Sequence, residues 1–290
     1  MKLSINSNDT AKVVGFEKAV EMFAEIGFDC YDASFFDVQS EFFKDGYKEY
    51  CKALRKKGEA LGITCNQAHA PFPCVDWGKD DFNKVRFGEV VRSMECAALL
   101  GADIIVVHPV HKNMPKSVDE YAVNKEFYEK LIPYAEKFGI RIATENMFKH
   151  DKHRNVKLTD VCNSPEKFVK MVDLIDSPWV TACLDVGHCG VVGEDAAEMI
   201  YALGHQRLKA LHIHDNNYLN DDHTVPFLGK MDWESICKAL ADINYDGVFT
   251  YETYPCSDHL PNELLPDALR FIHSVGRYLI KRIDVFKNSI

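Results

Sequence analysis

Six side chains able to bind a metal ion or carry a proton stand at the ends of six short apolar runs. In the stretch CLDVGH, at 183–188, the run ends at Asp185 and His188 follows three residues later. The other five runs end at His69, His108, Glu145, His212 and Glu252. A loop after the His212 run adds Asp221 and His223.

Each of these residues alone has an ordinary structural explanation. A histidine beside an apolar run often makes a structural hydrogen bond, Asp185 fits the N-cap of a helix, and Glu252 can pair with a lysine or arginine. Burying an ionisable group is costly, however, so six of them in equivalent positions indicate a shared site. Because the set mixes carboxylates with imidazoles, we expect a divalent metal of the Mn, Co, Zn or Fe type rather than calcium.

The elements that carry these residues alternate between strand-like and helix-like segments. Eight strands are predicted, at 2–6, 28–34, 62–69, 102–108, 140–146, 180–186, 208–214 and 247–253. The segments 87–101 and 124–139 have helical apolar spacing and end at a glycine. Eight parallel βαβ units over residues 1–290 predict one α/β domain, a (β/α)8 TIM barrel. A doubly wound sheet is the alternative, which the lack of a GxGxxG motif after the first strand disfavours.

In a barrel of this kind, the functional residues lie where the strands meet the loops that follow them. Glu145, Asp185, His212 and Glu252 end the fifth to eighth predicted strands, so we expect them to converge and to bind the metal. His212 and His214 are two residues apart and share a strand face. The periodicity therefore leaves the choice between these two histidines open.

Together these segments resemble the xylose-isomerase-like TIM-barrel superfamily, which includes sugar and sugar-phosphate isomerases and epimerases and the endonuclease IV branch. The motifs that carry the resemblance are HAPFP, HPV, ATENM, CLDVGH, LHIHD, DDHTVPFLGKMDW and YET. In the ketose 3-epimerases of this family, one Mn-type ion is held by Glu, Asp, His and Glu. The resemblance implies the same ligands here and selects His212 over His214. It also implies that His188 contacts substrate hydroxyls, whereas Tyr218 stands where those epimerases have an arginine.

The endonuclease IV branch binds three zinc ions through a longer ligand set, so the resemblance implies one metal ion and up to three. The chain has a candidate for every position of that set. His69, His108, Asp221 and His223 would then be metal ligands, and in a one-metal enzyme they would contact substrate with His188. The net charge of −10 and the lack of a long Lys/Arg run argue against a nucleic-acid partner.

The implied activity is isomerisation or epimerisation of a small carbohydrate or its phosphate, by proton transfer through an enediolate. Glu145 and Glu252 would be the acid and base, because two carboxylates can serve opposite faces of one carbon. Phe72, Trp77 and Tyr254 would shield the enediolate from water. The alternatives are a multi-zinc phosphodiesterase, a metal-dependent dehydratase or lyase, and a non-catalytic subunit that keeps the barrel.

The composition bears on the protein's surroundings. The longest apolar runs are far shorter than the roughly 18–20 residues of a membrane span, and the first ten residues lack the apolar core of a secretory signal. The ten cysteines show no CxxC pair, so we expect reduced thiols in a cytoplasmic protein with no membrane partner. The helix predicted over 267–283 has enough apolar surface to pack on the barrel or on a second copy in a homo-oligomer.

Overall fold

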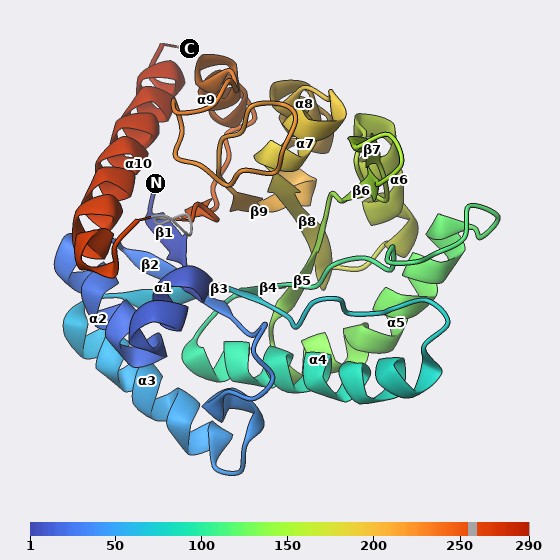
Figure 1. Ribbon diagram of the computed structural model, residues 1–290, viewed down its shortest axis with the longest axis horizontal. Helices are drawn as coiled ribbons and strands as arrows, with labels where there is room; N and C mark the ends of the chain where they lie inside the picture. Colours follow the sequence, from blue (N-terminus) through green and yellow to red (C-terminus); the bar gives the residue numbers. More distant parts are fainter. Residues whose placement is uncertain (255–259, 290) are drawn as a thin grey trace.

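Eight parallel strands form a barrel in the computed structural model, which describes residues 1–254 and 260–289 (Figure 1). They are β1 (Leu3–Asn6), β2 (Cys30–Ser34), β3 (Thr64–His69), β4 (Ile104–Val106), β5 (Arg141–Glu145), β8 (Val180–Asp185), β9 (Leu208–His212) and β10 (Phe249–Tyr251). A bridge between Ile213 and Tyr251 joins the two edge strands, β9 and β10. The eight predicted strands and the (β/α)8 barrel are confirmed, and the doubly wound sheet is excluded.

Helices surround the barrel and connect its strands (Figure 1). They are α1 (Asn8–Val14), α2 (Phe16–Ile26), α3 (Tyr47–Leu61), α4 (Asp80–Leu100), α5 (Glu120–Phe138), α6 (Pro165–Ile175), α7 (Val186–Val192), α8 (Ala196–Arg207), α9 (Trp233–Asp242) and α10 (Leu265–Lys287). The glycines expected to end two of them do so. Gly101 after α4 and Gly139 after α5 have φ values of 96° and 69°, a left-handed conformation that glycine adopts without strain.

The side chains inside the barrel change from apolar to polar towards the carboxyl ends of the strands. Ile104, Val106, Ala143, Cys183 and Ala210 form a small buried cluster of their own. Two residues further along β5, β8 and β9 stand Glu145, Asp185 and His212. Because side chains alternate between the two faces of a strand, these polar groups point into the barrel above the apolar cluster. The cluster thus closes the barrel from below and leaves the polar groups at its mouth.

A two-stranded hairpin between β5 and α6 was not predicted from the sequence. It consists of β6 (Phe148–Asp151) and β7 (Val156–Thr159), and both strands contact α7. Four-residue strands with mixed polarity give too short a pattern to separate from a loop. His150 and His153 are exposed on the hairpin, as expected of solvated residues.

The thiols and the last helix agree with the sequence analysis. The nine described cysteines are free and buried. α10 packs against β1, α2 and α9, so its apolar face covers the barrel, while Phe271 and Tyr278 stay about half exposed. None of the helices among the described residues combines the length and the apolar character that a bilayer span requires.

Candidate metal centre

Four side chains from consecutive strands of the barrel converge at its mouth. Glu145, Asp185 and His212 end β5, β8 and β9, and Glu252 directly follows β10. One ligand atom of each lies within 4.8 Å of the others, and all four residues are buried, with exposed fractions between 0% and 6%. His212 Nδ1 is 3.1 Å from Glu145 Oε1 and 3.5 Å from Glu252 Oε2. We call this set the central group; its geometry suits a divalent cation.

The charges of the central group are unbalanced without a cation. Three carboxylates are buried around one imidazole. Burial alone would raise the pKa of Glu145, but His212 and His108 outweigh it and hold this pKa well below its usual range. Burial would lower the pKa of His212, and the neighbouring acidic groups of Cys183, Glu145 and Glu252 instead raise it well above its usual value. A metal ion can replace the imidazole proton as the balancing positive charge.

Asp185 combines the two roles that the sequence left as alternatives. Its carboxylate caps α7 by accepting a hydrogen bond of 2.7 Å from the His188 backbone N–H, and it also belongs to the central group. Asn146 fixes the backbone on both sides, since its side chain accepts from Asp185 N and donates to Asp185 O. The residue that follows the neighbouring strand β5 therefore holds the end of β8 in place.

Gly187 is needed for space rather than for a tight turn. It lies inside α7, and a Cβ atom there would fall far inside van der Waals contact with the His214 ring. His214 Nε2 is 2.9 Å from Asp185 Oδ1. The glycine thus lets an imidazole lie directly against the helix and reach the Asp185 carboxylate.

A second set of ligand atoms lies beside the central group. It consists of His188, His214, Asp221 and His223, and we call it the outer group. His188 Nδ1–H donates to the Asn146 carbonyl at 2.7 Å, and His223 Nδ1–H donates to the Glu252 carbonyl at 2.7 Å.

Those two hydrogen bonds leave Nε2 of His188 and of His223 facing Asp221, at 3.6 Å and 3.0 Å. Metal-binding histidines commonly use the second ring nitrogen in this way. Burial would lower the pKa of His223, but Asp221 and Glu252 raise it to about 9. The structure therefore brings Asp221 and His223 together with His188, although they are far apart in the sequence.

His69 and His108 complete a third set with Glu145. His108 Nε2 is 3.0 Å from Glu145 Oε2, and His69 Nε2 is 3.5 Å from Glu252 Oε1. His69 Nε2 has no hydrogen-bond partner within the described part of the chain. All nine candidate residues from the sequence therefore lie in three adjoining groups.

Two residues beside these candidates were missed in the sequence analysis: Asp32, which forms a further set with His69 and His212, and His214 of the outer group. Asp32 on β2 is fully buried and lies 3.3 Å from His69 Nδ1. The signal was present, since an aspartate inside the apolar run 28–34 is costly unless it is paired. His214 was set aside in favour of His212, but both histidines point into the barrel mouth and each joins a different group.

Aromatic rings pack against four histidines of the groups. Ring centroids are 5.4 Å apart for Phe36 and His69, and 4.9 Å apart for Phe72 and His108. Phe148 packs on His188 at 4.9 Å, and Tyr254 stacks on His223 at 4.2 Å. Phe72 and Tyr254 are 40% and 37% exposed, so they border the mouth as expected. Trp77 does not, because it lines a separate cavity of about 510 Å³ with residues of α4 and α5.

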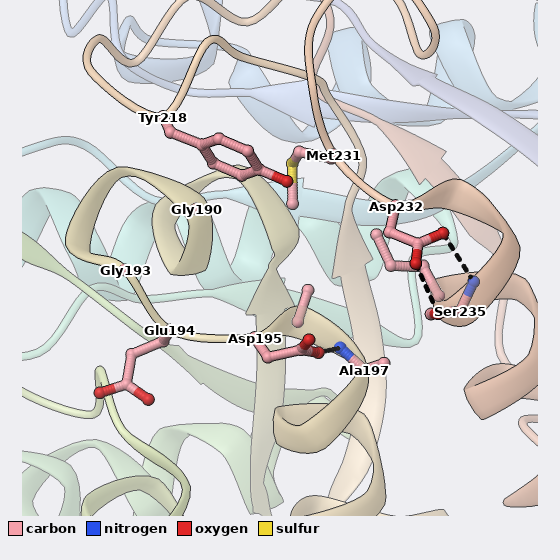
Figure 2. A pocket seen from close by; sticks show the side chains of 11 residues that line it. Gly190, Gly193, Glu194, Asp195, Ala197, Tyr218, Met231, Asp232 and Ser235 are labelled. Carbon is pink, nitrogen blue, oxygen red and sulfur yellow. Dashed lines mark hydrogen bonds between the residues drawn. The ribbon is translucent and has the colours of Figure 1, made fainter.

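Tyr218 also lies apart from the three groups. It lines a hollow of about 370 Å³ beside the starts of α8 and α9, where Asp195 and Asp232 cap the two helices (Figure 2). Its hydroxyl donates to the Lys230 carbonyl at 2.6 Å, and its ring lies close to Gly190. None of the residues that line this hollow belongs to a ligand group, so this tyrosine lies outside the candidate centre.

Comparisons with known proteins agree with this architecture. The chain is 27% identical to the uncharacterised protein MJ1311 of Methanocaldococcus jannaschii over 242 residues, covering 78% of this chain and 75% of the relative. It is 28% identical to an inosose dehydratase of Clostridium perfringens over 176 residues, covering 53% and 58% of the two chains.

Two solved structures have the same fold at lower identity. A D-tagatose 3-epimerase-like protein superposes with a TM-score of 0.77 at 21% identity, covering 100% of this chain and 99% of that one. The IolI protein with a bound zinc atom gives a TM-score of 0.77 at 19% identity, also covering 100% of this chain and 99% of that one. The model of the xylose isomerase-like TIM barrel family matches residues 20–275. The chain therefore belongs to the xylose isomerase-like TIM barrel family.

Proposed function

We propose that the protein is a divalent-metal-dependent isomerase or epimerase of a small carbohydrate. The observation that carries the proposal is the central group, in which four buried ligand atoms from four strand ends lie within 4.8 Å of one another. Membership of a family that includes sugar epimerases supports the substrate class. Glu145, Asp185, His212 and Glu252 would hold the cation, of the Mn, Co, Zn or Fe type.

The bound cation would stabilise the negative charge that builds up on substrate oxygens when the neighbouring carbon loses its proton. Glu145 and Glu252 approach the centre from different strands, and both lie within 3.5 Å of His212 Nδ1. Glu145 would accept the proton of the substrate carbon as a carboxylate. Glu252 would return a proton to the other face of the carbon, giving an epimer through an enediolate.

The outer group would orient the substrate. His188 Nε2 faces Asp221 across 3.6 Å, and His223 Nε2 faces the same carboxylate. In a one-metal enzyme, these side chains, with His69 and His108, would hydrogen-bond to the hydroxyls of the sugar. Phe72 and Tyr254 border the mouth and would keep water from the reacting carbons.

The test is hydrogen exchange between substrate and solvent. The Mn²⁺-loaded protein is incubated in D₂O with D-tagatose or D-psicose, and deuterium in the sugar is measured by NMR. We expect exchange in the wild-type protein and a loss of about 100-fold or more in Glu145→Gln and Glu252→Gln. Glu194→Gln is the matched control, because Glu194 lines the Tyr218 hollow outside the ligand groups. Full exchange in both test variants would contradict the proposal.

A second candidate follows from the three adjoining groups. Ten residues that can bind metal ions meet at one mouth, and a phosphodiesterase of the endonuclease IV type uses three zinc ions. It predicts three metal ions per chain and cleavage of a DNA duplex at an abasic site. Metal analysis that finds one ion, with no nicking of the duplex, rules this candidate out. The net charge of −10 favours the carbohydrate substrate.

Dehydration is a close variant of the first candidate. The relative from Clostridium perfringens is named inosose dehydratase. Removal of water from a cyclic keto-polyol also begins with loss of a proton beside a carbonyl, so the same two glutamates would serve. Incubation with an inosose distinguishes the two reactions, because a dehydratase forms an unsaturated product and an epimerase only a stereoisomer.

A further inference from the structure

A buried histidine outside the three groups has no role in the proposed reaction. His111 is in the loop between β4 and α5 and is 9% exposed. Its Nδ1 is 3.1 Å from Asp160 Oδ2, and Asp160 is 3% exposed. Because an ionised carboxylate only accepts, the hydrogen of a neutral His111 is on Nδ1 and Nε2 carries a bare lone pair.

Asp160 is well placed to fix this tautomer. Lys149 Nζ on the β6–β7 hairpin lies 2.6 Å from its other oxygen. Burial would raise the pKa of Asp160, but the hydrogen bonds from His111 and Lys149 outweigh it and lower this pKa. The loop itself is held by Asn124, whose side chain accepts from Val110 N and donates to Val110 O. The orientation of the His111 ring is therefore set before any ligand binds.

Nε2 of His111 is buried without a hydrogen-bond partner among the residues that the structure describes. Leaving a buried acceptor unpaired costs about 1–3 kcal/mol, so a donor is expected to meet it in the working protein. The ring of Phe72 stacks on His111 with centroids 5.9 Å apart and packs on His108 at 4.9 Å. The Phe72 ring thus lies against both His111 and His108, the side chain that contacts Glu145.

We propose that His111 is a specificity-determining residue whose Nε2 accepts a hydrogen bond from a substrate hydroxyl remote from the reacting carbons. This rests on the proposed carbohydrate substrate. Phe72 stacks on the His111 ring and is 40% exposed, so it would have to turn aside for a sugar hydroxyl to reach Nε2. Asp160 acts through His111 and is a positioning residue, because it keeps the hydrogen on Nδ1 and the lone pair on Nε2.

Three variants separate this role from simple support of the fold. In His111→Asn, the amide can still donate to Asp160, but no acceptor reaches the Nε2 position. In His111→Gln, the longer amide can present its oxygen near the Nε2 position. In Asp160→Asn, the shape is kept while the Nε2–H tautomer becomes accessible, and that tautomer cannot accept. None of these substitutions changes a member of the ligand groups, so the metal content should stay that of the wild-type protein.

The experiment compares D-tagatose with 6-deoxy-D-tagatose by kcat/KM for deuterium exchange and by calorimetric binding. Removing the 6-hydroxyl should lower kcat/KM of the wild-type protein by about threefold to tenfold, the range of one neutral hydrogen bond. His111→Asn should lose the same factor with D-tagatose and nothing further with the deoxy sugar. Asp160→Asn should lose less, because an Nε2–H can donate to the hydroxyl oxygen instead. His111→Gln should recover part of the loss.

Two results would overturn the assignment. If His111→Asn lowers kcat/KM equally for both sugars, His111 only supports the loop. If His111→Asn still discriminates between the sugars as the wild-type protein does, the hydroxyl bonds elsewhere. Both leave the proposed function intact, whereas failure of the wild-type protein to bind or exchange either sugar contradicts the proposed function and this assignment together.

Discussion

At the scale of single residues, the mouth of the barrel depends on a close contact between two elements. His214 on the chain leaving β9 occupies the space above Gly187 in α7, and its Nε2 lies 2.9 Å from the Asp185 carboxylate. One side chain thereby connects the central and the outer group. The candidate site therefore needs a residue without a side chain at Gly187, so that the large His214 ring can pack against α7.

Gly187→Ala tests this contact. The new methyl group overlaps the His214 ring, so we expect a loss of about 1–3 kcal/mol in unfolding free energy and weaker metal binding. Gly88→Ala in α4 is the control, because a Cβ atom there meets nothing within 4 Å. Chemical denaturation and metal titration measure both effects. In a His214→Ala background the penalty of Gly187→Ala should largely disappear, and a penalty that persists there would contradict the steric explanation.

The residues that sequence analysis found and those it missed differ in a physical way. Glu145, Asp185 and Glu252 were recognisable because an ionisable group at the end of an apolar run is costly and therefore informative. Asp32 lies inside such a run, but its meaning depends on His69, which is on the next strand. His111 pairs with Asp160 across 49 residues, a distance along the chain that no local pattern covers.

At the scale of elements, the loop between β9 and α9 is built around one buried carboxylate. Asp215 is fully buried and accepts hydrogen bonds from the backbone N–H groups of Asn216, Phe227 and Met231 and from Trp233 Nε1, at 2.7–3.1 Å. The loop that these bonds fold carries Asp221 and His223. Asp215 therefore supports the outer group without touching it.

Asp215→Asn should lower the unfolding free energy by about 2–4 kcal/mol. The new amide NH₂ cannot accept a hydrogen bond, so some of the N–H groups that now donate to the carboxylate would lose their partner. Thermal and denaturant unfolding measure the loss. Asp222→Asn on the same loop is the control, since Asp222 is exposed and makes one weak contact of 3.3 Å to Asn217 N. Equal stability of the two variants would show that the buried carboxylate does not organise the loop.

A second element-scale interaction ties α10 to the barrel. Asp29 Oδ2, before β2, accepts from Arg277 Nη1 of α10 and from Leu3 N of β1, both at 2.7 Å. Partial burial would raise the pKa of Asp29, but Arg277 and the Leu3 N–H outweigh it and lower this pKa. A depressed folded-state pKa stabilises the fold above the ordinary value of 3.8 and ceases to do so as the pH falls through the folded-state value.

Asp29→Asn should therefore destabilise the protein at pH 7 by roughly 0.5–1 kcal/mol, a modest value because the pair is partly exposed. Once the pH falls below the folded-state pKa of Asp29, the variant and the wild-type protein should be equally stable in this respect. Urea unfolding across this pH range gives the difference. A penalty that stays constant with pH would mean that the Asp29 charge does not contribute.

The elements themselves were largely predictable. The eight strands and the helices ending at Gly101 and Gly139 follow from apolar periodicity and from glycine at helix ends. The β6–β7 hairpin and the immediate start of α7 after Asp185 were not predictable. Both depend on contacts made after folding, because the hairpin packs on α7 and α7 is capped by a residue that also faces the barrel mouth.

At the scale of the whole molecule, folding brings together carboxylates whose charges repel one another and which the proposed cation would neutralise. The four residues of the central group come from strands spread over residues 141–252, so the site exists only in the folded chain. A ligand that binds only the folded state adds about 2.7 kcal/mol of stability at a free concentration of 100 Kd. The site should therefore be visible in the stability of the complete chain.

Removal of metal by EDTA should lower the thermal unfolding midpoint, and added Mn²⁺ or Zn²⁺ should restore it. Glu252→Gln should respond weakly to both treatments, because one ligand of the central group is lost. His205→Gln should respond as the wild-type protein does, since His205 bonds to the Asn244 carbonyl on the outside of the barrel. If EDTA does not change the thermal unfolding midpoint of the metal-loaded wild-type protein, the cation does not stabilise the fold.

The most direct test of the central claim is a crystal structure of the Mn²⁺-loaded protein with an anomalous difference map at the manganese absorption edge. One dominant peak enclosed by Glu145, Asp185, His212 and Glu252 is expected. The absence of a peak there, with metal bound elsewhere or not at all, would contradict the central claim.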